Sequence, residues 1–91
     1  MNSHKTRDFD LLLETLPDEI QDQAGDAYRT WMGNPRHPGL HFERIRGSNP
    51  PMCSVRITRN YRAVGIYAAP DTVVWFWIGP HAEYDRVIGR S

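Results

Sequence analysis

The first third of the chain repeats its apolar positions every three to four residues, which is the period of an amphipathic helix. Residues 7–16 form one apolar stripe, and a second stripe begins after Pro17. Proline is tolerated in the first turn of a helix, and Asp18 and Glu19 complement the helix dipole there. Residues 33–35 (GNP) supply a glycine C-cap followed by a proline, which ends the second stripe. The pattern predicts two antiparallel helices ahead of any strand.

Beyond these helices the pattern changes to short extended runs of apolar and β-branched residues. Four such runs can be counted, at residues 40–45, 52–58, 61–68 and 72–78. The segments between them are short enough for hairpins, and the last run (TVVWFWI) carries no charge, so we expect it to be buried on both faces. Residues 82–89 are expected to add a helical turn or two. The predicted fold class is α+β: an N-terminal helical hairpin packed on a four-stranded, mainly antiparallel sheet with a short C-terminal helical segment.

Length and composition favour a single domain over residues 1–91, because a chain of this size has room for one hydrophobic core. Cys53 is the one cysteine, so an intramolecular disulfide cannot form and a reducing compartment is expected. The first residues lack the apolar core of a signal peptide, and the longest apolar run is far shorter than the roughly 20 residues that span a bilayer. We therefore expect a cytoplasmic protein with no membrane partner.

Charge is polarised along the chain although the formal net charge is zero. Residues 1–30 hold three basic and seven acidic side chains, whereas residues 31–91 hold eight basic and four acidic ones. The eight basic residues are all arginines, namely Arg36, Arg44, Arg46, Arg56, Arg59, Arg62, Arg86 and Arg90. A guanidinium presents a planar fork of donors that fits phosphate oxygens two at a time, which favours a polyanionic partner. The alternative is that these arginines solvate exposed strand faces and pair with the acidic helices.

Candidate site residues gather in the second half of the predicted sheet. Val55 and Ile57 alternate with Arg56, so Arg56 projects from the opposite face, and the next strand offers Arg62. The segment after the last strand is polar and carries His81, Glu83, Tyr84 and Asp85. A strand end can hold such groups rigidly beside solvent, so this segment is a suitable place for chemistry.

Neither a metal site nor a reactive thiol is expected. His37 and His41 are four residues apart, but the Pro-Gly pair between them prevents the helical face that two zinc ligands need. No cysteine or carboxylate cluster completes a ligand set. Cys53 has no neighbouring feature in the sequence that would activate its thiol. We therefore predict no metal and no cofactor.

Three motifs, taken in order, give the chain a family resemblance. They are NPRHPGLHF at residues 34–42, SVRITRNYRAVG at 54–65 and VVWFWIGPHAEYDR at 73–86. Preceded by a helix and a proline-started helix, this order resembles the RelE/ParE toxin superfamily of type II toxin–antitoxin systems. The resemblance is strongest over residues 35–90, and it places the N-terminal strand usual in the family within residues 1–6.

The resemblance implies a small α/β toxin that is neutralised by a cognate antitoxin. Antitoxins of this family hold the toxin with an extended segment, often a helix, which crosses the sheet or displaces the C-terminal segment. By this likeness Arg44, Arg46 and Arg56 would meet carboxylates of the antitoxin.

Two activities occur in the family, so the resemblance leaves a choice. RelE-like members cut messenger RNA in the ribosomal decoding site, whereas ParE-like members poison DNA gyrase through a different surface. We interpret the chain as a RelE-like endoribonuclease that cleaves messenger RNA on the ribosome, and so inhibits translation, without a metal or small-molecule cofactor. The alternatives are a ParE-like gyrase inhibitor, which should tolerate the loss of His81, and a non-catalytic antitoxin-binding module.

The resemblance also implies roles for single residues in cleavage by the 2′-hydroxyl, which needs phosphorane stabilisation and proton transfer. Arg62 matches an arginine that contacts the scissile phosphate, and Arg56 matches a neighbouring basic position. His81 and Tyr84 fall where RNA-cleaving relatives place acid/base and base-stacking groups, and His81 can exchange protons near neutral pH. Glu83 is an alternative general base. The predicted RNA-binding residues are Arg44, Arg46 and Arg59.

Structural interpretations stand beside these roles. His81 could simply cap the last segment. Tyr84 continues an apolar stripe with residues 87 and 88, so core packing would also explain it. Glu83 could form a salt bridge with a neighbouring arginine, and Glu43 dilutes the basic positions around it.

Overall fold

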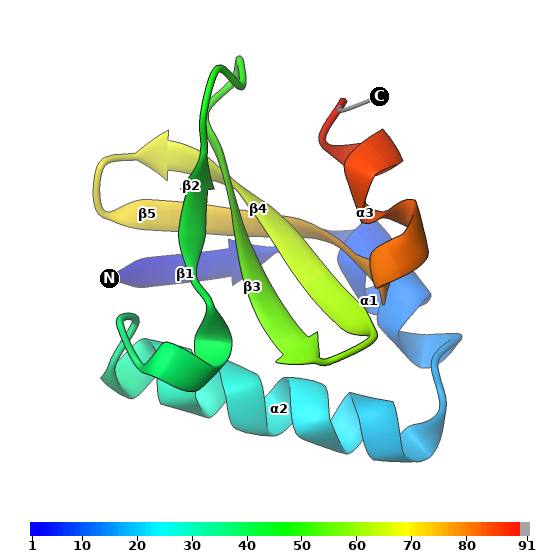
Figure 1. The fold of residues 1–91 in the computed structure, drawn as a ribbon. Coiled ribbons are helices and arrows are strands. Elements are labelled where there is room, and N and C mark those ends of the chain that lie inside the picture. The colour runs from blue at the N-terminus through cyan, green and yellow to red at the C-terminus, as the bar shows by residue number, and fades with distance from the viewer. Residues whose placement is uncertain (90–91) are drawn as a thin grey trace.

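The computed structural model describes residues 1–89 and has a five-stranded sheet with helices on both faces (Figure 1). Arg90, which belongs to the predicted arginine set, lies outside the described residues. In chain order the elements are β1 (Asn2–Lys5), α1 (Arg7–Glu14), α2 (Asp18–Gly33), the 3₁₀ turn η1 (Pro38–Leu40), β2 (Glu43–Ile45), β3 (Met52–Thr58), β4 (Tyr61–Ala69), β5 (Thr72–Pro80) and α3 (His81–Val87). None of the helices within residues 1–89 has the length and apolar character needed to cross a membrane.

The strand order across the sheet is β1-β5-β4-β3-β2. The strands β2 to β5 form an antiparallel meander, while β1 pairs in parallel with β5, from Asn2 opposite Thr72 to Lys5 opposite Trp75. The predicted α+β class and the mainly antiparallel sheet are therefore confirmed, but the prediction of four strands is wrong. The fifth strand is the polar edge segment NSHK, which is mostly exposed and so has no apolar alternation by which to recognise it.

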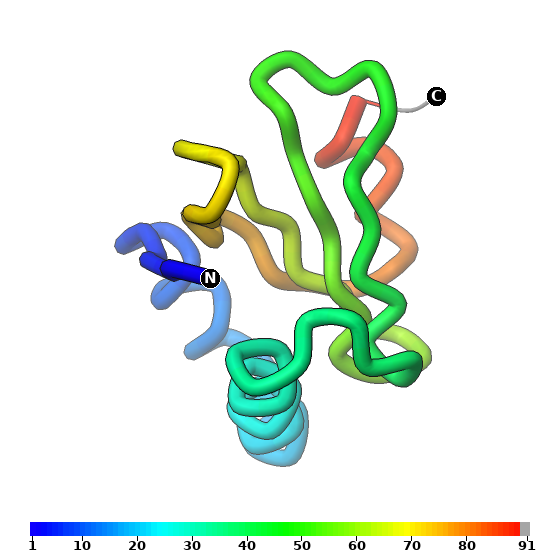
Figure 2. The backbone as a smooth tube through the Cα atoms, turned by 90° about the vertical axis from the view of Figure 1, so that its left-hand side faces the viewer, coloured from blue at the N-terminus to red at the C-terminus, as the bar shows by residue number. Residues whose placement is uncertain are grey.

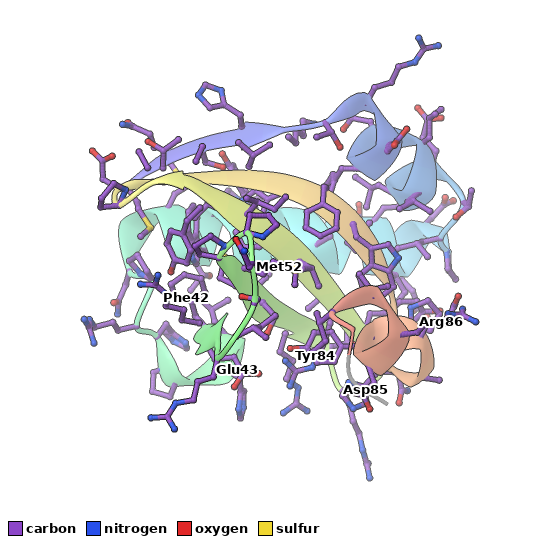
Figure 3. The ribbon with its side chains drawn as sticks, turned by 90° about the horizontal axis from the view of Figure 1, so that it is seen from above. Phe42, Glu43, Met52, Tyr84, Asp85 and Arg86 are labelled. Atoms are coloured by element: carbon purple, nitrogen blue, oxygen red, sulfur yellow. The ribbon has the colours of Figure 1, made fainter. Side chains whose placement is uncertain are left out.

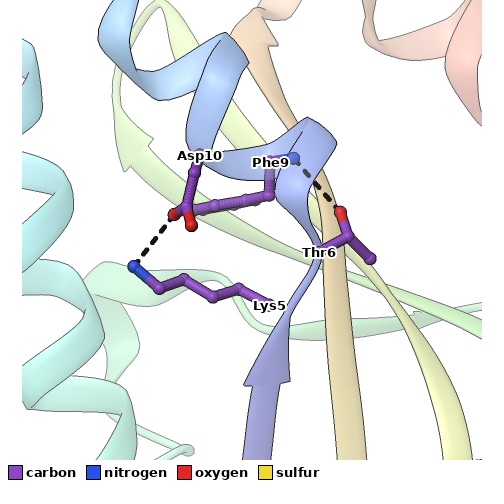
Figure 4. Close-up of polar contacts among 4 residues, drawn as sticks. All are labelled: Lys5, Thr6, Phe9 and Asp10. Carbon is purple, nitrogen blue, oxygen red and sulfur yellow. Dashed lines mark hydrogen bonds and ion pairs between the residues drawn. The ribbon is translucent and has the colours of Figure 1, made fainter.

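The turn from β1 into α1 is fixed by local polar contacts (Figure 4). Thr6 is the N-cap of α1, and its hydroxyl accepts a hydrogen bond of 3.1 Å from the backbone N–H of Phe9. Lys5 Nζ lies 2.9 Å from Asp10 Oδ1, which ties the end of the strand to the first turn of the helix. These contacts hold the helical hairpin against β1 at the edge of the sheet.

The two N-terminal helices cover one face of the sheet, and α3 covers part of the other (Figure 2). Trp31 on α2 is 1% exposed and packs edge-on against Trp75 of β5 with ring centroids 5.2 Å apart. On the opposite face, Tyr84 and Ile88 pack against Ile45 and Val64. The main core thus lies under the helical hairpin, and a smaller one lies under α3.

The strand β5 is covered on both faces, but unequally. Val73, Trp75 and Ile78 are buried in the main core, whereas Phe76 and Trp77 are half-buried against the α3 cluster. On this second face α3 has only seven residues, and Phe76 and Trp77 stay partly exposed beside it. The same face carries Arg56 and Arg62.

The predicted run at residues 40–45 is divided in the structure. Pro38 to Leu40 form the 3₁₀ turn η1, and only Glu43–Ile45 form a strand. Between them His41 adopts a left-handed backbone with φ 46° and ψ 41°. A left-handed residue cannot continue an extended strand, so the strand starts after it.

Candidate functional site

A buried hydroxyl, that of Ser54 on β3, lies at the centre of the polar face beneath α3. Ser54 is 0% exposed. The hydroxyl of Tyr84 donates to Ser54 Oγ over 3.0 Å, and Arg62 Nη1 donates to the same oxygen over 3.3 Å. Glu43 Oε1 is a second acceptor for the Tyr84 hydroxyl at 3.3 Å. Strands β2, β3 and β4 and helix α3 therefore each contribute one side chain to a single hydrogen-bonded group.

Tyr84 is 3% exposed, and its ring lies under the guanidinium of Arg62. The Cζ atom of Arg62 lies 4.9 Å from the centroid of the Tyr84 ring, within cation–π range. Burial, with Glu43 nearby, raises the pKa of the Tyr84 phenol, against smaller opposing effects of the Ser54 hydrogen bond and of Arg62. Tyr84 is thus a neutral phenol whose ring packs in the small core, as the structural interpretation expects. Figure 3 shows Tyr84 and Glu43 on the same side of the molecule.

Arg56 and Arg62 are direct cross-strand partners on β3 and β4. Like charges directly opposite one another repel, so the pair is disfavoured unless an anion compensates it. The polar contacts found for them do not involve a carboxylate: Arg56 Nη1 lies 3.3 Å from His41 Nε2, and Arg62 contacts Ser54. Within residues 1–89, no salt bridge engages either arginine. The pair therefore presents two uncompensated cations on one face of the sheet.

His81 is exposed at the start of α3, beside this arginine pair. Its backbone N–H donates to the carbonyl of Asn60 over 2.6 Å, which fixes the first turn of α3 to the β3–β4 turn. Its ring stacks on that of Tyr84, with centroids 5.8 Å apart and an interplanar angle of 16°. Pro80 is the N-cap of α3 and His81 follows it, so the imidazole is not the cap.

The other predicted residues lie further away. Glu83 forms an exposed salt bridge of 3.0 Å with Arg86 on α3. The guanidinium of Arg44 stacks over the ring of Tyr67 at 5.3 Å, and strand alternation sends it to the opposite face from Glu43. Arg46 and Arg59 are exposed in the turns at either end of β3. The structure thus brings together Arg56, Arg62, His81 and Tyr84 but not the remaining arginines.

Three residues of this face were missed by the sequence analysis as members of a site: His41, Glu43 and Ser54. Ser54 shares strand parity with Arg56, so alternation alone would have placed both on one face. Glu43 is opposite Ser54 and could be placed only once the β2–β3 register was known. His41 lies before the strand, where alternation does not apply.

Three other features of the structure lack groups that could bind or cleave a phosphate. An apolar cavity of about 290 Å³ lies between the helical hairpin and the sheet; it has no arginine in its lining, and its lysine, Lys5, is paired with Asp10. Burial raises the pKa of the Cys53 thiol to about 12, which keeps it protonated and unreactive. Across residues 1–89, no three side chains of the metal-ligating types gather in one place.

Comparison with known proteins gives the class of fold. No family model matches the chain, and no curated protein matches it. A RelB–RelE antitoxin–toxin complex from Methanococcus jannaschii gives a TM-score of 0.70 at 16% identity, with 91% of this chain and 96% of that chain covered. A RelE–RelB complex from Pyrococcus horikoshii OT3 gives 0.66 at 11% identity, covering 87% and 92%. The YoeB/ParE toxin of Agrobacterium tumefaciens gives 0.67 at 17% identity, covering 89% and 99%.

The chain therefore has the fold of the RelE/ParE toxins. The resemblance drawn from its motifs is confirmed at the level of the fold, and the N-terminal strand usual in the family is β1, which the four-strand prediction left out.

Proposed function

We propose that the chain is the toxin of a type II toxin–antitoxin system and a metal-independent endoribonuclease that cleaves messenger RNA on the ribosome. The observation that carries the proposal is the Arg56–Arg62 pair, two cations directly opposite each other with no carboxylate partner among the described residues. An RNA phosphate would relieve their repulsion and fill both guanidinium forks. The fold that this chain shares with the RelE-containing complexes supports the same proposal.

Cleavage by the 2′-hydroxyl sets three tasks for the protein. It must hold the phosphate in line, stabilise the charge that develops on the pentacoordinate phosphorus, and transfer one proton on each side. In this proposal Arg62 and Arg56 bind the phosphate oxygens. His81, exposed and beside the pair, gives a proton to the departing 5′-oxygen.

Tyr84 contributes by supporting Arg62. Its ring lies under the guanidinium, and its hydroxyl shares the acceptor Ser54 with it. Base stacking by Tyr84, the role implied by the resemblance, would require α3 to leave the sheet, because the ring is buried with α3 in place. Glu83 is held by Arg86, so as an alternative general base it would first have to break that salt bridge.

The partner we propose is a cognate antitoxin whose carboxylates cover Arg56 and Arg62. Two similar structures were solved as RelE–RelB complexes. An acidic antitoxin segment would compensate the same repulsion as an RNA phosphate, so neutralisation and substrate binding would compete for one surface.

The test is induced expression in a bacterial host, with the 5′ ends of messenger RNA mapped within minutes. Wild type should arrest growth and produce new in-frame cleavage sites in translated messages. Arg62→Ala should reduce cleavage by about 100-fold, the usual effect of removing one group that stabilises a developing oxyanion, and His81→Ala should also reduce it. The control is Arg29→Ala, which removes an arginine of α2 that pairs with Asp26, on the far side of the sheet.

Two other results would count against this function. Growth arrest with intact messages and broken DNA would indicate gyrase as the target. Absence of arrest, with the protein folded by circular dichroism, would leave an antitoxin-binding module.

A further inference from the structure

A contact joins His41 to Arg56 on the face that carries the arginine pair. Arg56 Nη1 lies 3.3 Å from His41 Nε2. A guanidinium has only donors, so Nε2 must be the acceptor in this hydrogen bond. In this contact Nε2 of His41 therefore directs a lone pair at Arg56.

His41 reaches that pair from the β2 side of the sheet. It lies just before β2, whose first residue Glu43 is opposite Ser54, and its ring contacts Arg56, two residues beyond Ser54 on β3. Arg56 in turn is opposite Arg62, and Arg62 is opposite Gly79, two residues before His81. The two arginines therefore lie between two histidines that come from opposite sides of the site.

The backbone holds His41 in an unusual conformation. Its φ of 46° is left-handed, a backbone conformation that is unfavourable for a residue with a β-carbon. The buried side chain of Leu40 anchors the turn, and the N–H of His41 donates to the carbonyl of Pro38 over 3.3 Å. Left-handed residues of this kind are retained where the surrounding structure fixes them, and they concentrate at functional sites.

We propose that His41 is the general base that takes the proton of the attacking 2′-hydroxyl, a role that rests on the RNA cleavage proposed above. When a phosphate binds, the donors of Arg56 turn to its oxygens and release the Nε2 lone pair. Nε2 then accepts the proton of the 2′-hydroxyl while the bond from the 2′-oxygen to phosphorus forms. The bond from phosphorus to the 5′-oxygen breaks, and that oxygen takes a proton from the imidazolium of His81.

The products of this step are a 2′,3′-cyclic phosphate and a 5′-hydroxyl. The reaction starts with His41 neutral and His81 charged and ends with the charges exchanged, so protons and electrons balance. The charged groups near His41 are Arg56 of β3, which it contacts, Arg62 opposite Arg56 on β4, and Glu43, two residues later in the chain at the start of β2. Cleavage should therefore have a bell-shaped pH profile, with His41 responsible for the acidic limb.

The test is His41→Gly, assayed on ribosome complexes that carry a defined messenger RNA. Glycine adopts a positive φ without strain, so the turn should be preserved while the imidazole is removed. We expect cleavage to fall about 100-fold, within the usual range for loss of a general base. Added imidazole should restore at least tenfold, and the acidic limb of the pH profile should be lost. His4→Gln, which changes a histidine of β1 at the opposite edge of the sheet, should cleave as wild type does.

Each other outcome has a definite meaning. Full activity of His41→Gly beside an inactive Arg62→Ala would overturn the role of His41 and leave the proposed function standing. A folded but inactive His41→Gly that imidazole does not rescue would also overturn it, because a structural role has that signature. If wild type itself does not cleave, both proposals fail.

A second measurement does not depend on cleavage. Nitrogen-15 NMR of the histidine rings in the wild-type protein should show His41 as the Nδ1–H tautomer. Finding the proton on Nε2 would contradict the contact with Arg56 and the proposal built on it.

Discussion

At the scale of single residues, Ser54 links Arg62 of the sheet to Tyr84 of the C-terminal helix. Its buried hydroxyl on β3 accepts hydrogen bonds from Arg62 of β4 and from Tyr84 of α3. Away from water such bonds are stronger, and an unpaired partner costs more. One oxygen therefore fixes both the direction of the guanidinium and the position of the helix.

The hydroxyl of Tyr84 should contribute measurably to stability. Tyr84→Phe keeps the packed ring and removes the hydrogen bond to Ser54, so the free energy of unfolding should fall by about 0.5–1.5 kcal/mol. Urea denaturation at neutral pH measures this, and Tyr28→Phe is the matched control because that ring is 44% exposed on α2. A control variant that loses as much as Tyr84→Phe would argue that the buried hydroxyl has no special contribution.

Strand parity predicted Arg56 and Arg62 on one face, and the structure places them opposite each other, with His81 stacked on Tyr84 at the strand end. The roles that the family resemblance implies for these four residues stay predictions. The contacts among them were not accessible in the same way. The His41–Arg56 contact depends on the left-handed turn ahead of β2, which has no signal in the sequence. The burial of Tyr84 depends on how closely α3 packs, which periodicity suggests but cannot measure.

At the scale of elements, β4 and β5 approach closely where Gly65 faces Val73 and Trp75. A β-carbon at Gly65 would lie 2.6 Å from Val73 Cγ1 and 3.0 Å from Trp75 Cε3. The register of the two strands also shifts between Val64 and Gly65. Glycine at this position therefore lets the aromatic part of β5 pack against the neighbouring strand.

Two glycine substitutions should have opposite effects on stability. Gly65→Ala forces the crowded side chains of β5 apart and should cost about 1–3 kcal/mol. Gly25→Ala, inside α2, meets only Arg29 Nη1 at 3.5 Å and should gain about 0.5–1 kcal/mol from helix propensity. Thermal denaturation, monitored by circular dichroism, measures whether each variant loses or gains stability. A gain in stability for Gly65→Ala would mean that β4 and β5 are packed less tightly at this position than the structure shows.

The elements best predicted from sequence were those whose apolar residues repeat with a clear period or whose end is marked by glycine and proline. The bounds of β3 match the predicted run, and α2 ends at the GNP signal. The weakest prediction was at β1, whose pairing comes from backbone hydrogen bonds at a sheet edge and leaves no apolar pattern. The strand β2 is shorter than the predicted run because the backbone of His41 is left-handed, a conformation that the sequence pattern does not reveal.

At the scale of the whole molecule, the polarised charge follows the two faces of the sheet. The acidic side chains of residues 1–30 lie mainly on the helical hairpin, whereas Arg56 and Arg62 project from the other face. A polyanion approaching the arginine face is separated from most of the carboxylates by the thickness of the sheet. A net charge of zero is therefore compatible with one face of the protein that attracts polyanions.

Binding of single-stranded RNA should depend on salt through these arginines. Releasing counterions from two phosphates gives a slope of about −1.4 in log affinity against log salt concentration, since each contact on a single strand contributes about −0.7. Arg62→Ala should reduce the steepness by about 0.7, whereas Arg29→Ala on α2 should leave it unchanged. The probe is an oligonucleotide with a 2′-deoxy nucleotide at the cleavage position, titrated at several salt concentrations. Equal slopes for wild type and Arg62→Ala would show that Arg62 does not contact a phosphate.

The parallel pairing of β1 with β5 joins two strands that are made at very different times during translation. Asn2 pairs with Thr72, and at roughly 5–20 residues per second about 4 to 14 s separate the synthesis of the two partners. In that interval β1 has no strand to pair with, and His81 and Tyr84 have not yet been added. A nascent chain therefore cannot assemble the face that carries Arg56, Arg62 and His81 until β5 and α3 have left the ribosome that makes them.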